Sequence, residues 1–385
     1  VVLHVHVIVA YKTLVLKKFL FILVLPFLSG STFSQKVLFE TFPKKYVAYR
    51  TTEALVMNGL LDEADWQNVP WTDDFVDIEG SLKPRPVYRT RVKMLWDEEY
   101  FYIAAELEEP HLWATFTERE TIIFHENNFE VFIDPNGDTH NYYELEINAL
   151  GTIWDLLLPK PYRNGGAPIS AWDVAGFKYG INLRGTLNDP SDRDTLWTLE
   201  MAFPWKILKE AAPGKRKPHP GEQWRINFSR VQWQIEAVDG QYKKVIKPET
   251  GFPYPEYNWV WSPQGVIDMH RPESWGYVQF SGLKAAEGGE PVVINPDEYL
   301  KFVLRELYYL QHRFFWAHQR YAKSLEELEP EDPEFFAPCP VVFDVARTRF
   351  RLSIPSAAGN ATWHISEDSR IWKTSLKLEE RGMFY

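Results

Sequence analysis

The sequence contains a single cysteine, Cys339, among its 385 residues. One cysteine cannot form an intrachain disulfide, and it excludes zinc sites and redox pairs that are built from two or more cysteines. The chain also lacks a basic excess, since its formal net charge is -11. Nucleic acids and anionic membranes attract clustered lysine and arginine. We therefore expect neither nucleic acid nor a membrane surface as a partner.

Long apolar runs are missing as well. The run at residues 19–28 is too short for a bilayer span, which needs about 20 apolar residues. Lys17 and Lys18 precede it and small polar residues follow it, which is the order of a secretory signal. We predict a signal peptide over residues 1–35, with residues 1–15 as a candidate upstream extension; the alternative is a buried N-terminal helix. The mature protein is then expected to be periplasmic or extracellular, without a membrane span.

Aromatic residues are abundant, with 16 Trp, 19 Tyr and 25 Phe. Such a content is typical of β-sandwich cores and also of surfaces that stack on flat apolar ligands such as sugar rings. Composition alone leaves both interpretations open.

The strand pattern predicts a mainly β fold, an antiparallel β-sandwich over residues 36–281. Short strands separated by Pro, Gly, Asn and Asp are expected at 87–95, 100–107, 129–133, 196–203 and 224–233, with short helical segments at 61–66 and 204–211. Residues 282–291 are small and polar and are predicted to be a linker.

A small α+β domain is predicted over residues 292–385. Apolar residues recur at helical spacing from Tyr299 to Tyr321, which predicts a long amphipathic helix that ends before Pro330. Alternating runs at 341–345, 350–354 and 362–365 predict a small sheet that packs against it.

A polar face is predicted within residues 127–155. Glu144, Glu146 and Asn148 alternate with apolar residues along one strand, and Glu130 on the preceding strand is expected on the same face. A tight hairpin at residues 150–151 would set Glu146 opposite Asp155 and turn Trp154 toward the core. A polar strand face can bind a ligand, but it can equally be the solvated outer face of an antiparallel sheet.

Four signatures occur in a fixed order: 58–63 with Trp66, 96–97 with 100–105, 128–134, and 197–205. Together with the closing segment 261–276, they make residues 51–281 resemble the family 9 carbohydrate-binding modules. The resemblance implies a β-sandwich that binds sugars, often at chain ends, without catalysis. It also implies structural calcium in some members.

The resemblance assigns ligand-face positions to this sequence. Glu130 matches the glutamate before the Asp-Pro turn, Phe124 falls at the first aromatic platform, and Asn148 matches an asparagine of the next strand. Glu146 stands where the family has a cationic side chain. The second stacking tryptophan falls near Met269, beside His270.

Aromatic faces and polar side chains together suit a sugar. Trp172 lies in a loop and is either a ligand contact or a loop anchor, whereas Arg230 either reaches hydroxyls or pairs with Glu130 or Glu146. We predict that the ligand-binding residues are Phe124, Glu130, Glu146, Asn148, Asp155, Trp172, Arg230, Trp261 and His270.

The turn at Asp134, Asn136 and Asp138 places oxygen atoms at alternate positions, which suits a structural calcium ion. A hairpin turn without metal explains the same residues and is favoured, because the rest of a calcium loop is missing. No other cofactor is expected.

The combined prediction is a secreted, non-catalytic carbohydrate-binding protein that works beside polysaccharide-degrading enzymes. One alternative is a glycoside hydrolase that uses paired carboxylates among Glu130, Glu146 and Asp155. Another is a haem-binding electron-transfer sandwich with Met269 or His270 as axial ligand, although neighbouring residues cannot readily take opposite axial positions.

Overall fold

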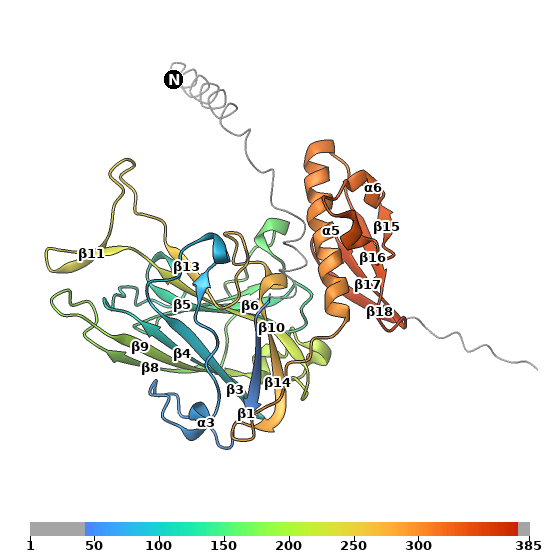
Figure 1. The fold of residues 1–385 in the computed structure, drawn as a ribbon. Helices are drawn as coiled ribbons and strands as arrows, with labels where there is room; N and C mark the ends of the chain where they lie inside the picture. Colours follow the sequence, from blue (N-terminus) through green and yellow to red (C-terminus); the bar gives the residue numbers. More distant parts are fainter. Residues whose placement is uncertain (1–42, 376–385) are drawn as a thin grey trace, which may run out of the picture.

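The computed structural model describes residues 43–375, so the predicted signal peptide lies outside the described residues. The described chain forms a β-sandwich followed by a small C-terminal α+β domain (Figure 1). This confirms the predicted fold class.

The sandwich is one continuous twelve-stranded sheet that folds over on itself. Its main path is β7-β6-β5-β10-β14-β1-β3-β4-β9-β8, with β13 on β10 and β2 on β13. A separate hairpin contains β11 and β12. The strand bounds are β1 Lys45–Arg50, β2 Val76–Asp77, β3 Thr90–Trp96, β4 Tyr100–Glu108, β5 Asn128–Asp134, β6 Tyr142–Asn148, β7 Ile153–Leu158, β8 Lys178–Arg184, β9 Leu196–Pro204, β10 Gln223–Gln232, β11 Ile235–Val238, β12 Gln241–Lys244, β13 Tyr257–Val260 and β14 Gly276–Lys284.

The pairing is antiparallel except at β1, which runs parallel to both of its neighbours, β14 and β3. On either side of β1 the sheet forms the two layers of the sandwich. Met94 and Ile103 of one layer share a core with Val131, Ile147 and Phe228 of the other, and all five are almost completely buried. The alternate side chains of β5 and β6 therefore face away from this core.

The helical segments of the sandwich are short. α3 covers Ala64–Gln67 and α4 covers Trp205–Leu208, near the two predicted positions. Five 3-10 turns are η1 Gly80–Leu82, η2 Ile123–His125, η3 Tyr162–Asn164, η4 Pro213–Lys215 and η5 Pro272–Ser274. Three of them, η2, η3 and η5, border the polar side of β5 and β6 through the loops described below.

The C-terminal domain has its own apolar core between α5 (Asp297–His318) and the sheet β15-β16-β17-β18. The strands are β15 Val342–Val345, β16 Phe350–Pro355, β17 Ala361–Ser366 and β18 Ile371–Ser375, and the short helices are α6 Leu325–Leu328 and α7 Pro333–Phe336. α5 ends at His318, earlier than Pro330 suggested, because Gln319 adopts the left-handed conformation (φ 54°). The strand β18 was not predicted.

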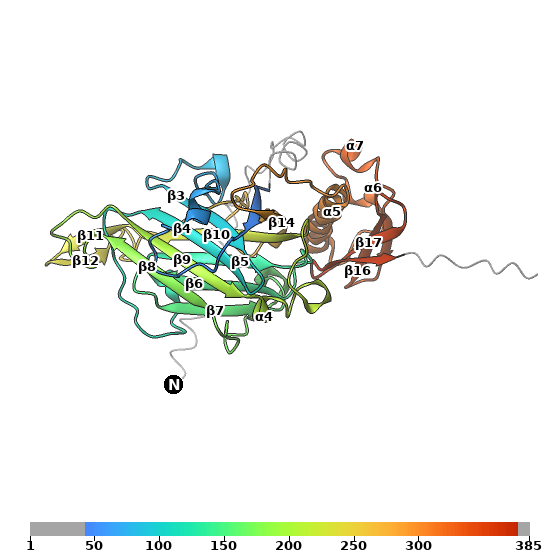
Figure 2. The ribbon, with the colours of Figure 1, turned by 90° about the horizontal axis from the view of Figure 1, so that it is seen from below.

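Figures 1 and 2 show α5 between the sandwich and the C-terminal sheet. Side chains of α5 bond to the sandwich directly: Arg305 donates to the carbonyl of Gly137, and Tyr308 accepts from Asn164. The turn between β17 and β18 also contributes, because the Thr139 hydroxyl donates to the carbonyl of Ser369. Polar contacts from α5 and from this turn therefore join the two domains.

Candidate functional site

The outward face of β5, β6 and β7 forms the floor of a cavity of about 400 Å³, which we call the carboxylate cavity. Residues from neighbouring loops and from β13 complete it. The lining residues are Phe124, Glu130, Phe132, Glu144, Glu146, Trp154, Leu156, Tyr162, Glu256, Asn258, Met269 and His270. Four predicted site residues, Phe124, Glu130, Glu146 and His270, thus lie together.

Strand register brings the acidic side chains of the floor side by side. Glu130 of β5 is the direct partner of Glu146 on β6, and Phe132 is the partner of Glu144. Directly opposed residues project from the same face of a sheet. The period-two alternation therefore places three carboxylates on the cavity side, with Val131 and Leu145 in the core.

Burial shifts the titration of these carboxylates. It raises the pKa of Glu130 to about 8, and the charge of Glu256 raises it further. Burial and the neighbouring Glu130 also hold the pKa values of Glu144 and Glu146 well above their usual range. The cavity therefore carries fewer negative charges near neutral pH than its composition implies.

Two oxygen atoms in the cavity lack a hydrogen-bond partner within the described chain. They are Oε2 of Glu144 and Oε2 of Glu146, on side chains that are 5% and 2% exposed. Buried polar atoms are nearly always paired, so these two open acceptors are available to donors from a ligand or from water.

Aromatic rings form the walls of the cavity. The rings of Phe124 and Trp154 lie 6.4 Å apart at 33°, and both residues are partly exposed. The rings of Tyr162 and His270 pack edge to face, with their centroids 4.4 Å apart. Burial, together with Arg163, lowers the pKa of His270 to about 3, so its ring is neutral near pH 7. The Tyr142 hydroxyl lies 3.0 Å from Nδ1 of this ring.

The β6–β7 hairpin differs from the predicted two-residue turn. A three-residue loop, Ala149 to Gly151, joins the strands, with the amide of Asn148 donating to Thr152 O and Gly151 at φ 85°. The extra residue shifts the register by one, so Glu146 faces Trp154 and Leu145 faces Asp155. Trp154 consequently lines the cavity, contrary to the prediction that it faces the core.

The same shift removes Asp155 from the predicted site. Its carboxylate is fully buried on the core side, where it pairs with Arg119 at 2.6 Å and accepts the amide of Val174. Asn148 is also engaged internally: its amide donates to Glu126 Oε1 and its oxygen accepts the amides of Leu150 and Thr152. Both residues organise loops and do not line the cavity.

The remaining predicted ligand residues lie elsewhere. Trp172 stacks on Tyr143 with ring centroids 4.8 Å apart, which corresponds to the loop-anchor alternative. Trp261 is 1% exposed and packs in the core over Gly276, so no ligand can stack on it. Arg230 pairs with Glu109 at 2.9 Å and not with Glu130 or Glu146.

The acidic turn after β5 is held together by its own hydrogen bonds. Asp134 accepts the amides of Gly137 and Thr139 through its two oxygens, Asn136 accepts the amide of Asp138, and Asp138 accepts the amide of His140. This is the arrangement of a hydrogen-bonded turn. Among residues 43–375, no group of three or more His, Cys, Asp or Glu side chains is placed to hold a metal ion.

Met269 and His270, the residues behind the haem alternative, both border the cavity. Gln264 donates to the Met269 sulfur at 3.8 Å, and Nδ1 of His270 lies within hydrogen-bond distance of the Tyr142 hydroxyl. Both side chains thus have a structural use in the cavity wall.

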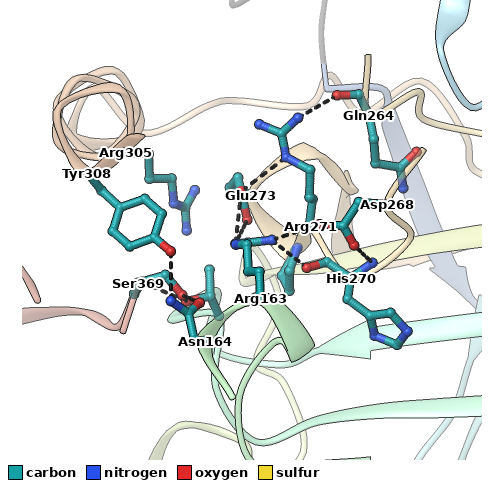
Figure 3. A network of polar contacts seen from close by, with 12 residues as sticks. Arg163, Asn164, Gln264, Asp268, His270, Arg271, Glu273, Arg305, Tyr308 and Ser369 are labelled. Carbon is teal, nitrogen blue, oxygen red and sulfur yellow. Dashed lines mark hydrogen bonds and ion pairs between the residues drawn. The ribbon is translucent and has the colours of Figure 1, made fainter. Parts of the chain in front are cut away.

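A network at the domain boundary holds the cavity rim (Figure 3). Arg163 donates to the carbonyl of His270 at 2.6 Å and to Glu273 at 3.1 Å, while Asn164 donates to Tyr308 of α5 at 2.7 Å. Burial alone would raise the pKa of Glu273, but Arg163 and Arg271 hold it well below its usual value. Figure 3 shows the His270 ring turned away from these arginines.

A larger groove of about 730 Å³ lies between the domains, beside this network. Its charged lining is largely paired within the protein. Glu273 bonds Arg163, Arg271 and Tyr309, and Lys301 pairs with Glu298. The carboxylate cavity is therefore the candidate functional site.

Some cavity residues were not among the predicted ligand-binding residues. Glu144 shares the alternation of Glu146 and could have been included on that signal alone. Trp154 depended on the hairpin register. Tyr162, Glu256 and Asn258 reach the cavity from distant segments, and no local pattern marks them.

Residues 57–220 match the family model described as carbohydrate family 9 binding domain-like. No functionally curated protein matches the chain significantly. Among the described residues, no helix combines the length and the apolar character that a membrane span requires.

The solved structures that match this chain include proteins from two bacteria. A protein from Bacteroides uniformis, described as a candidate carbohydrate-binding protein, shows 15% identity and a TM-score of 0.44 and covers 62% of this chain and 99% of its own. A family 9 carbohydrate-binding module from Caldicellulosiruptor kristjanssonii with cellotriose shows 15% identity and a TM-score of 0.39, covering 65% and 100%. Its structure with glucose shows 15% identity and a TM-score of 0.40, covering 66% and 100%.

The match to the family model agrees with the resemblance that the ordered signatures indicated, and the family is one of non-catalytic binding modules, in keeping with the prediction that the protein is not an enzyme. Residues 57–220 of this chain are thus similar to the domains described as carbohydrate family 9 binding domain-like.

Proposed function

We propose that the sandwich binds a saccharide in the carboxylate cavity. The observation that carries the proposal is the pair of buried, unpartnered oxygens on Glu144 and Glu146 beside the partly exposed rings of Phe124 and Trp154. A sugar ring offers hydroxyl donors for such oxygens and an apolar C–H face for an aromatic ring.

The raised pKa values fit this role. A glutamic acid that keeps its proton both donates and accepts hydrogen bonds. Glu130, with a pKa of about 8, can therefore donate to the oxygen of a sugar hydroxyl or accept its hydrogen. Asn258 and the neutral His270 add further polar groups to the cavity lining. A sugar hydroxyl exchanges hydrogen bonds to water for hydrogen bonds to the protein, and the net gain in free energy is small. Dissociation constants on the order of micromolar to millimolar are therefore expected.

Export and association with polysaccharide-degrading enzymes belong to the same proposal. They rest on the signal-like order of residues 17–35 and on the family match. Cleavage near residue 35 upon expression with a secretion pathway would support export, and mass spectrometry of the mature N-terminus measures it.

Calorimetric titration of the full chain tests saccharide binding, with glucose, cellotriose and a panel of other mono- and oligosaccharides as probes. Trp154→Ala and Glu146→Ala are expected to weaken binding at least about tenfold, because the first removes one stacking face and the second removes a hydrogen-bonding carboxyl group. Trp172→Ala and Glu108→Gln, outside the cavity, are the matched controls. Absence of binding across the panel, or equal affinity in both pairs of variants, would contradict the proposal.

A further inference from the structure

The carboxylate cavity has an uneven charge composition. Four glutamates line it, Glu130, Glu144, Glu146 and Glu256, whereas the described lining residues include no lysine or arginine. The one basic side chain is His270, which burial keeps neutral. Arg230, the cation that sequence analysis placed near Glu130 and Glu146, pairs instead with Glu109.

Cations near the cavity are also directed elsewhere. Arg163 donates to Glu273 and to the main chain of His270. Lys244 lies with its ammonium 3.2 Å from the centroid of the Trp233 ring, although its charge still acts on Glu256. The protein thus leaves its group of cavity carboxylates without an internal counter-ion in the lining.

Such a group is costly without a partner. Glu130 and Glu146 are opposed on neighbouring strands, and like charges in that position repel. Protonation relieves the repulsion in the empty cavity, and a bound cation relieves it when the cavity is filled. The unpartnered Oε2 atoms of Glu144 and Glu146 are the acceptors that such a cation would meet.

The side chains that line the cavity indicate what kind of cation fits. These glutamates do not form a metal-holding group within residues 43–375, so an organic cation suits them better. A protonated primary amine carries three N–H donors and one positive charge, which matches two or three carboxylates. The rings of Phe124 and Trp154 require that the amine be attached to a body with an apolar face.

We propose that the carboxylate cavity selects a saccharide with a free, protonated amino group, a glucosamine-type unit, over its neutral or N-acetylated counterparts. This inference rests on the proposed saccharide-binding function and narrows its ligand class. The amine bonds the carboxylates of Glu144 and Glu146, while the sugar ring contacts Phe124 or Trp154.

Binding then moves protons in a defined direction. The ammonium stabilises the ionised carboxylates, so glutamates that are protonated in the empty cavity release protons to the solvent as the amine binds. A neutral sugar produces no such release. Calorimetry in two buffers with different ionisation enthalpies measures the number of protons released.

The experiment compares glucosamine, N-acetylglucosamine and glucose with the full chain at pH 7. We expect glucosamine to bind at least about tenfold more tightly than the other two, since charge-assisted hydrogen bonds exceed neutral ones, and to release protons. Glu144→Gln and Glu146→Gln should each reduce the preference severalfold, whereas Glu108→Gln on β4 should keep it. A thermal melt of each variant confirms folding.

The outcomes separate the two proposals. Equal affinity for glucose and glucosamine, without proton release, would overturn the amine preference and leave saccharide binding in place. Tight binding of a polyamine with no binding of any sugar would overturn both the saccharide assignment and the amino-sugar assignment. Failure of all three sugars and their oligomers to bind would likewise overturn both proposals.

Discussion

Glu130 and Glu146 are direct partners across β5 and β6, at 4% and 2% exposure, and both carboxyl groups have raised pKa values. A carboxyl group with a raised pKa binds more protons in the folded state than in the unfolded state. Its contribution to stability is therefore present at low pH and is lost as the pH rises from the unfolded value, about 4.5, toward the folded value.

The free energy of unfolding of the unliganded protein should therefore fall as the pH rises from 6.5 to 8. His270, with its pKa lowered to about 3, acts in the opposite direction only below pH 6.5, so the acidic groups dominate this window. Glu130 alone contributes up to about 2 kcal/mol over 1.5 pH units. Urea unfolding at several pH values measures the slope.

Glu130→Gln should flatten that slope, and the residual slope would reflect Glu144, Glu146 and the other acids with raised pKa. A slope that is unchanged in this variant would mean that Glu130 is ionised in the folded protein at pH 7.

Arg163 is predicted to be essential for the rim of the cavity. Arg163→Met leaves the buried Glu273 with less compensation and frees the carbonyl of His270, so we expect a loss of about 3–5 kcal/mol in unfolding free energy. Arg370→Met is the control, because Arg370 is 55% exposed and lies 3.8 Å from Asp138, which implies less than about 1 kcal/mol. Chemical denaturation compares the two, and equal losses would contradict the role of Arg163.

Asp155 should matter for stability and not for binding. Asp155→Ala removes the partner of Arg119 and of the Val174 amide, at a cost of about 2–4 kcal/mol. Saccharide affinity, measured below the melting temperature, should stay within about twofold of the original value. A large loss of affinity with unchanged stability would return Asp155 to the ligand site.

Gly276 is predicted to tolerate no side chain. A Cβ atom there would lie 2.3 Å from Cζ3 of Trp261, whereas at Gly282 on the same strand it would lie 3.3 Å from Pro220. Gly276→Ala should cost at least about 1–3 kcal/mol by overpacking, and Gly282→Ala much less. Thermal melting of both variants decides whether Trp261 is as firmly enclosed as its burial indicates.

Calcium should not change the melting temperature of the protein. The oxygens of Asp134, Asn136 and Asp138 accept amides of their own turn. We expect the same melting temperature with millimolar calcium and with EDTA, within about 1 °C. A rise of several degrees with calcium would show that the turn binds the ion after all.

The sequence could predict the sandwich and part of the cavity for a simple physical reason. Period-two alternation fixes which face a strand residue occupies, and this was enough to bring Glu130 and Glu146 together. Phe124 and His270 came from the family resemblance, which carries information that alternation lacks.

The other predicted residues failed because their partners lie far along the chain. Arg230 forms an ion pair with Glu109, and Trp261 packs against Gly276. Both contacts depend on how the two layers of the sandwich pack together. No local pattern contains that relation. The position of Asp155 failed for a different reason, since the length of one turn decided it.

That turn has a wider consequence. Because side chains alternate along a strand, shortening the loop of Ala149 to Gly151 by one residue would exchange the two faces of β7 relative to β6. Ile153 and Asp155 would then enter the cavity, and Trp154 would be forced into the core. The loop itself does not line the cavity, so insertions and deletions at a remote hairpin tip could give relatives of this protein a different binding wall without any substitution inside it.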